Sequence, residues 1–176
     1  MDTYWHEIRA YKGEIEDIAA KLEEFRRDPS CFANSTHFGI GLSNRALLIL
    51  VGMCALVESR LYEIAKEEQS KHAFTVEDIN GQGITRLQKY LARSKRIDFG
   101  NVRKWDKFKA AYEIRNTFVH SYGGLVETKL QPKAQEALNA LGMQDALFGH
   151  RIRFTFTQMR DIHEIFNVVL EELRNV

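Results

Sequence analysis

The stretch IRNTFVHSYGG, residues 114–124, holds the residue types best suited to chemistry in this sequence. Arg115 lies in the middle of an apolar segment, and Asn116 and His120 follow it. On a helix of about 3.6 residues per turn, Asn116 and His120 lie on adjacent turns at the edge of the apolar arc, and Arg115 lies near its centre. We therefore expect the Arg115 side chain to point into the protein rather than into water.

An arginine, a polar amide and a histidine are sufficient for metal-free cleavage of RNA. A histidine can move a proton to or from the 2′-hydroxyl or the leaving oxygen. An arginine can stabilise the charge that develops around the phosphorus atom in the transition state. This chemistry predicts His120 as the general acid or base and Arg115 as the phosphate stabiliser. Asn116 would orient the phosphate or His120.

A second charged residue, Glu58, interrupts another apolar helical segment. A lone buried charge is unfavourable by several kcal/mol, so each of the two charges needs a partner. We expect Glu58 and Arg115 to face each other, which predicts that their helices pack together. Such a pair could serve only to fix the register of the two helices. Alternatively it could orient Arg115 and leave guanidinium donors free for a ligand phosphate.

Helical periodicity dominates the chain, which has only two prolines. It predicts six helices, over residues 3–27, 43–69, 84–94, 101–121, 133–141 and 157–174. Ser43 or Asn44 is expected to cap the second helix, after a loop over residues 31–41, and Thr155 or Thr157 to cap the last. The fourth helix is expected to stop at Gly123-Gly124.

Residues 125–130 and 150–156 alternate between apolar and polar side chains with a period of two. This alternation is typical of strands, and the two segments could pair as a small hairpin that flanks the short helix over 133–141. We expect an all-α fold with this hairpin as its only sheet.

Composition indicates one domain over residues 1–176 and excludes several functional classes. The net charge of +1 gives no global signal for nucleic acid or membrane binding. The two cysteines are too few for a disulfide framework, and neither they nor the histidines have metal-ligand spacing. The longest apolar run, residues 46–57, is too short to span a bilayer and is expected to be a buried helix. These features predict a cytoplasmic protein with no membrane contact, metal or cofactor.

The motif Arg115-Asn116-Thr117-Phe118-Val119-His120 resembles the hallmark of the HEPN superfamily, an Arg followed after a few residues by His. The Gly pair that follows it, and Glu58 on a neighbouring helix, are similar to features of many members. The resemblance implies an up-down bundle of four to five helices with its core over 43–124, joined by helices 3–27 and 157–174 and interrupted by an insertion over 125–156.

The same resemblance implies a function and a partner. Active members are metal-independent endoribonucleases without a cofactor, and many serve in toxin–antitoxin systems or antiviral defence. They act as homodimers in which the two motifs meet across a composite cleft, so RNA and a second copy are the expected partners. Glu58 would then hold Arg115. The alternative is a catalytically inactive HEPN module that binds RNA or nucleotide, or acts as a scaffold.

Two further features bear on partners. In one HEPN subgroup the motif continues His, any residue, Tyr, which here is His120-Ser121-Tyr122. Tyr122 could therefore be modified by a cognate antitoxin or nucleotidyltransferase, or could be a core or interface tyrosine. Residues 86–109 hold nine basic and two acidic residues and lead into the motif helix. This segment could be a solvated face or could follow an RNA backbone. The candidate RNA-binding residues in it are Arg93, Lys95, Arg96, Arg103 and Lys104.

Overall fold

The computed structural model describes residues 3–28, 30, 35–121 and 125–176. Within them the protein is mostly helical, with six α-helices and one small antiparallel hairpin. The helices are α1 (Thr3–Arg27), α2 (Ser35–Gln69), α3 (Gly83–Ser94), α4 (Trp105–Val119), α5 (Gln131–Leu141) and α6 (Phe156–Arg174). The strands are β1 (Leu147–Phe148) and β2 (Arg151–Ile152).

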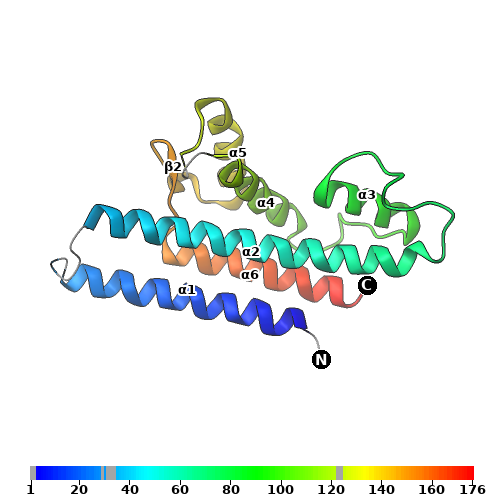
Figure 1. Ribbon diagram of the computed structural model, residues 1–176, viewed down its shortest axis with the longest axis horizontal. Coiled ribbons are helices and arrows are strands. Elements are labelled where there is room, and N and C mark those ends of the chain that lie inside the picture. The colour runs from blue at the N-terminus through cyan, green and yellow to red at the C-terminus, as the bar shows by residue number, and fades with distance from the viewer. Residues whose placement is uncertain (1–2, 29, 31–34, 122–124) are drawn as a thin grey trace.

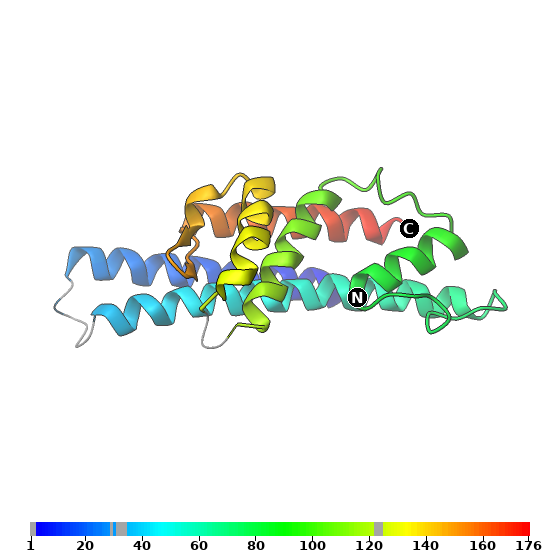
Figure 2. The same ribbon diagram turned by 90° about the horizontal axis from the view of Figure 1, so that it is seen from above.

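The three longest helices, α1, α2 and α6, lie side by side and pack against one another (Figure 1). On the other side of α2 and α6, the helices α4 and α5 pack together and cross them steeply (Figure 2). The helix α3 packs against α2 further along its length, apart from α4 and α5. This arrangement confirms that the helix carrying Glu58 packs against the helix carrying Arg115.

The helix α2 provides the centre of the core. Leu50, Met53, Cys54 and Val57 are completely shielded from solvent, and burial raises the pKa of the Cys54 thiol. The expectation about membranes considered residues 46–57 alone, whereas the helix that contains them is longer. By length and composition Thr36–Gln69 could cross a membrane, since an 18-residue window has a mean hydropathy of 1.9. In this structure four other helices pack against it.

The start of α2 differs from the prediction. The helix begins at Ser35, so residues 35–41 are helical and the loop expected there is wrong. Neither Ser43 nor Asn44 is a cap, and the Ser43 hydroxyl donates to the Ile152 carbonyl at 3.2 Å. The segment contains Gly39 and Gly41, but Leu42 and Ala46, which follow them, pack in the core. Packing of this kind overrides the weak helix propensity of glycine.

The other element ends agree more closely with the sequence. The fourth helix begins at Trp105 rather than 101, because Lys104 adopts a left-handed conformation with φ +60°. It ends at Val119, and the glycine pair expected to stop it lies outside the described residues. Thr155, not Thr157, caps α6 and forms a capping box with Gln158.

The hairpin is present but its strands pair differently from the prediction. β1 pairs with β2, so both strands come from residues 147–152. The segment expected as the first strand contributes one bridge, between Leu125 and Arg151, and Thr128–Leu130 forms a 3₁₀ turn instead. The period-two pattern of 125–130 is therefore too short a signal to distinguish a strand from a turn that leads into α5.

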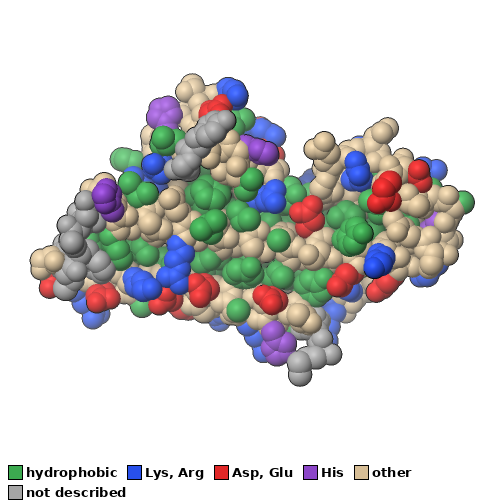
Figure 3. Space-filling model, in the orientation of Figure 1, with side chains coloured by type: hydrophobic (Ala, Val, Ile, Leu, Met, Phe, Trp, Pro, Cys, Tyr) green, Lys and Arg blue, Asp and Glu red, His purple; other side chains and the backbone are tan. Residues whose placement is uncertain are grey.

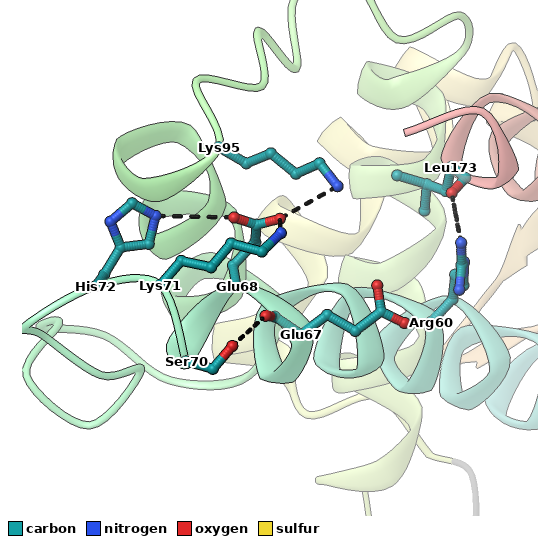
Figure 4. A network of polar contacts seen from close by, with 8 residues as sticks. All are labelled: Arg60, Glu67, Glu68, Ser70, Lys71, His72, Lys95 and Leu173. Atoms are coloured by element: carbon teal, nitrogen blue, oxygen red, sulfur yellow. Dashed lines mark hydrogen bonds and ion pairs between the residues drawn. The ribbon is translucent and has the colours of Figure 1, made fainter.

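A buried carboxylate fastens the C-terminal end of α2 to the chain that leaves α3 (Figure 4). Glu68 is 5 % exposed, and its Oε1 lies 2.9 Å from the Lys71 ammonium and 3.4 Å from the Lys95 ammonium. The Nε2 atom of His72 lies 3.7 Å from Oε2. The bond from Lys71, supported by Lys95, holds the pKa of Glu68 below its usual range. This cluster therefore helps to fix the position of α3 on α2.

The substitution Glu68→Gln is expected to lower the free energy of unfolding at neutral pH, because it removes the charge that the lysines bind. A carboxyl with a lowered folded pKa contributes stability above its unfolded pKa and loses it as pH falls through the folded pKa. Urea unfolding from pH 7 down to pH 3 should show the deficit shrinking with acidity. The neighbouring Glu67→Gln, at an exposed position outside the cluster, is the control. A deficit that is independent of pH would contradict the assignment.

Candidate functional site

A cleft of about 830 Å³ opens above α2, between the start of α3 on one side and α4 with the 127–133 segment on the other. The space-filling view shows this hollow between the two parts that rise from the long helices, with basic and acidic side chains on its floor (Figure 3). Arg115, Asn116 and His120 all line the cleft, and Glu58 lines it from α2. The structure thus brings the three candidate catalytic residues and Glu58 to one cavity.

Arg115 is half-buried at the edge of this cleft, and its donors are only partly used. Its Nη1 atom donates to the Asn116 Oδ1 atom at 2.9 Å. Its Nε atom is buried and has no hydrogen-bond partner among the described residues. A buried donor without an acceptor is unfavourable by about 1–3 kcal/mol, and more when it carries charge. An anionic ligand that draws the guanidinium toward itself would relieve this penalty.

The expected ion pair between Glu58 and Arg115 is absent from the structure. Both side chains instead contact Tyr112, which lies one turn before Arg115 on α4. The Tyr112 hydroxyl donates to Glu58 Oε2 at 3.4 Å, and the Arg115 guanidinium carbon lies 5.3 Å from the centre of the tyrosine ring. A cation over an aromatic face is attracted by the ring quadrupole. Tyr112 therefore joins the two charges by one contact at each end of its side chain.

Burial further favours the neutral form of this tyrosine. Desolvation is the main cause that raises the pKa of Tyr112, and the nearby Glu58 carboxylate adds to it. Because the phenol stays protonated well above neutral pH, its hydroxyl remains a donor to Glu58. Burial is also the main cause that raises the pKa of the Cys54 thiol, while the nearby Arg115 charge lowers it and the Glu58 charge raises it.

The first turn of α3 approaches the tyrosine closely. Gly83 begins this helix with φ +50°, a left-handed conformation that side chains rarely adopt. A Cβ atom built on Gly83 would lie 2.9 Å from the Tyr112 hydroxyl and 3.4 Å from Glu58 Oε1. Only glycine therefore allows the α3 wall to lie this close to the contact between Tyr112 and Glu58.

His120 lies at the C-cap of α4 and is exposed to solvent at the edge of the cleft. Its backbone N–H donates to the Asn116 carbonyl at 3.1 Å, which ties its position to the last turn of the helix. Tyr122, the candidate for modification, lies outside the described residues. Among the described residues no three His, Cys, Asp or Glu side chains come together in a group that could hold a metal ion.

The five candidate RNA-binding residues do not line the cleft, whereas Lys109, from the same basic segment, does. Lys95 contacts Glu68. Arg103 and Lys104 form ion pairs with carboxylates on α6, in which the Arg103 Nε atom lies 2.6 Å from Glu172 Oε1 and the Lys104 Nζ atom lies 3.6 Å from Glu164 Oε1. Arg93 stacks on Phe74 at 4.4 Å from the ring centre, and Arg96 adopts φ +58° in the turn after α3.

Three lysines line the cleft. They are Lys109 on α4, Lys129 in the 3₁₀ turn and Lys133 on α5, and each lies 2.8–2.9 Å from a carboxylate oxygen. The last two come from the segment 125–156, whose role the sequence left open. Their position could not be predicted, because it depends on how α5 packs against α4. Tyr112 and Gly83 are also missed, although Tyr112 is three residues before Arg115 on the same helix.

The substitution Gly83→Ala tests the close approach of α3. A left-handed conformation disfavours alanine by roughly 1–2 kcal/mol, and here the added methyl must also push the Tyr112 hydroxyl away from Glu58. We expect a larger loss of unfolding free energy than for Gly142→Ala, measured by urea denaturation. Gly142 is the matched control, since it has φ +77° and no atom within 4 Å of a built Cβ. Equal losses would show that the close approach of Gly83 to Tyr112 does not contribute to the free energy of unfolding.

Comparison with known proteins finds no match for this chain among family models, curated proteins or solved structures.

Proposed function

We propose that this chain is a metal-independent endoribonuclease of HEPN type that acts as a homodimer. The observation that carries the proposal is the convergence of Arg115, Asn116 and His120 on one cleft. Arg115 has no carboxylate within 4.0 Å among the described residues, so its charge is available to a phosphate. The cleft is open to solvent and large enough to admit a nucleotide of a flexible strand.

Cleavage would follow the general route of metal-free RNA cleavage by internal transesterification. The 2′ oxygen attacks the adjacent phosphorus, the bond from phosphorus to the 5′ oxygen breaks, and a cyclic phosphate and a 5′-hydroxyl result. One group must take the proton of the 2′-hydroxyl and another must give a proton to the leaving oxygen. His120 would perform one of these transfers. Arg115, oriented by Asn116, would stabilise the negative charge on the non-bridging oxygens.

A second copy of the chain would supply the other proton-transfer group. An exposed apolar stripe on α2 contains Leu48, Ala55 and Tyr62, spaced by seven residues so that they share one face. Glu58 lies between them on the same side of the helix and lines the cleft. The stripe therefore borders the site, and a two-fold contact along it would bring two cleft edges together. A dimer of this kind would place two His120 residues near one strand.

Within this proposal the fold is a variant of the HEPN bundle, in which the segment 125–156 adds a wall to the cleft. The biological setting would be a toxin–antitoxin or defence system in the cytoplasm. A cognate antitoxin or nucleotidyltransferase that modifies Tyr122 would then silence the enzyme by adding bulk and charge two residues after His120.

The catalytic roles are tested by RNA cleavage in EDTA. We expect the native chain to cut single-stranded RNA, and His120→Ala to reduce the rate by about 10²-fold or more, as for loss of a general acid or base. Arg115→Ala should cost a similar factor through lost charge stabilisation. The controls are His6→Ala and Arg26→Ala, which change the same residue types at exposed positions on α1, outside the cleft. Intact RNA that is nevertheless bound by the native protein would favour the non-catalytic binding module.

The dimer is tested by a matched pair of exposed alanines. Ala55→Glu places a charge in the α2 stripe, and Ala140→Glu places the same charge on α5. A carboxylate buried at an apolar contact is strongly unfavourable, so only Ala55→Glu should yield a monomer by size-exclusion chromatography with light scattering. Cleavage activity should fall in parallel, since each site would need both copies. A native monomer, or an unaffected Ala55→Glu dimer, would refute the arrangement.

A further inference from the structure

The Glu58 carboxylate is left with unused acceptor capacity on the floor of the cleft. Its one hydrogen bond within the described part of the chain is the 3.4 Å contact from the Tyr112 hydroxyl, and no lysine, arginine or histidine there forms an ion pair with it. A carboxylate offers about four lone-pair sites on two oxygens. A half-buried carboxylate in a ligand-sized cleft, without a cation, is suited to accept hydrogen bonds from a ligand.

Cationic and acidic groups lie on opposite sides of the cleft. The side formed by α4 holds Arg115 and His120, whereas Glu58 lies against the α3 wall, near Gly83. Gln82 and Gln88 on that wall also line the cleft, and their amide side chains form no hydrogen bond within the described residues. One tyrosine contacts a residue of each side, with Arg115 over its ring and Glu58 at its hydroxyl.

A nucleotide carries two groups that match these two sides. Its anionic phosphate suits the side with Arg115, and its hydrogen-bonding base suits the side with Glu58. Single-stranded RNA is read mostly through the exposed edges of its bases. Guanine presents two adjacent donors, N1–H and the 2-amino group, which one carboxylate can accept together. Uracil presents a single N3–H between two carbonyl oxygens that a carboxylate repels. Adenine and cytosine each present an amino group beside an acceptor nitrogen.

We propose that Glu58 is the base-reading residue of the cleft and selects guanine in single-stranded RNA, by accepting hydrogen bonds from N1–H and the 2-amino group. Arg115 binds a phosphate of the same strand, and Gln82 and Gln88 contact the remaining base and sugar atoms. This inference rests on the proposal that the cleft binds RNA, but it does not require that the RNA be cut.

The experiment measures binding rather than cleavage. Fluorescent 2′-O-methyl pentanucleotides, which cannot be cut by attack of the 2′ oxygen, carry G, A, C, U or inosine at the central position between uridines. Fluorescence anisotropy with the native full chain should show guanine bound at least about tenfold more tightly than uracil, since bonds to a charged acceptor are the stronger ones. Inosine lacks the 2-amino group and should fall between the two. Equal binding of all five, or no binding, would overturn the inference.

The variants separate Glu58 from the rest of the cleft. Glu58→Gln presents one acceptor and one donor, the pattern that pairs with adenine, so the preference should move from guanine toward adenine. Glu127→Gln is the matched control, because Glu127 lines the same cleft but lies 2.8 Å from Lys129, and it should keep the guanine preference. Circular dichroism checks that each variant is folded, and the inosine comparison needs no variant. A guanine preference that survives in folded Glu58→Gln would overturn the assignment.

The same measurements keep this inference distinct from the proposed nuclease. A guanine preference in a chain that leaves RNA intact in EDTA would support base reading and refute catalysis. Cleavage that is indifferent to the central base, together with equal binding, would support catalysis and refute base reading.

Discussion

Packing against α2 is the constraint on which the rest of the structure depends. The helices α1, α3, α4 and α6 all contact it, and its buried face runs through the middle of the core. The cleft exists because α3 and α4 occupy separate stretches of the same helix and leave Glu58 between them. Burial of apolar side chains thus does more than stabilise the fold, since it sets the distance between the two walls of the site.

Tyr112 resolves the problem that two half-buried charges create. A direct ion pair would neutralise both Glu58 and Arg115, and the guanidinium would then have less to offer a phosphate. The tyrosine instead gives the carboxylate one donor and gives the cation an aromatic face. Each charge is partly compensated, and each keeps hydrogen-bonding capacity toward the cleft. The incomplete compensation includes the buried Nε atom of Arg115, which has no acceptor within the described residues.

The sequence was sufficient to predict the six helices, apart from the first eight residues of α2 and the start of α4, and the packing of α2 on α4. These follow from periodicity, because a helical wheel gives the direction in which each side chain leaves its own axis. A wheel does not give the offset of one helix along another. For that reason the ion pair was expected where Tyr112 intervenes. The α3 wall and the lysines of the 127–133 segment were missed because they depend on the packing of elements distant in sequence.

The helix α3 is fixed to α2 near both of its ends, beside Glu58 at Gly83 and beside Glu68 at Lys95. Glu58 and Glu68 are ten residues apart on a continuous helix, which corresponds to a rise of about 15 Å. The rise along α2 therefore matches the distance between the two points at which α3 contacts it. Inserting one residue between the two carboxylates would shift Glu68 by about 1.5 Å and rotate it by about 100°, away from Lys95. An insertion or deletion between Glu58 and Glu68 keeps both contacts only if it is close to a whole number of helical turns. We therefore expect a change of length in this segment to destabilise the fold more than the same change in a loop.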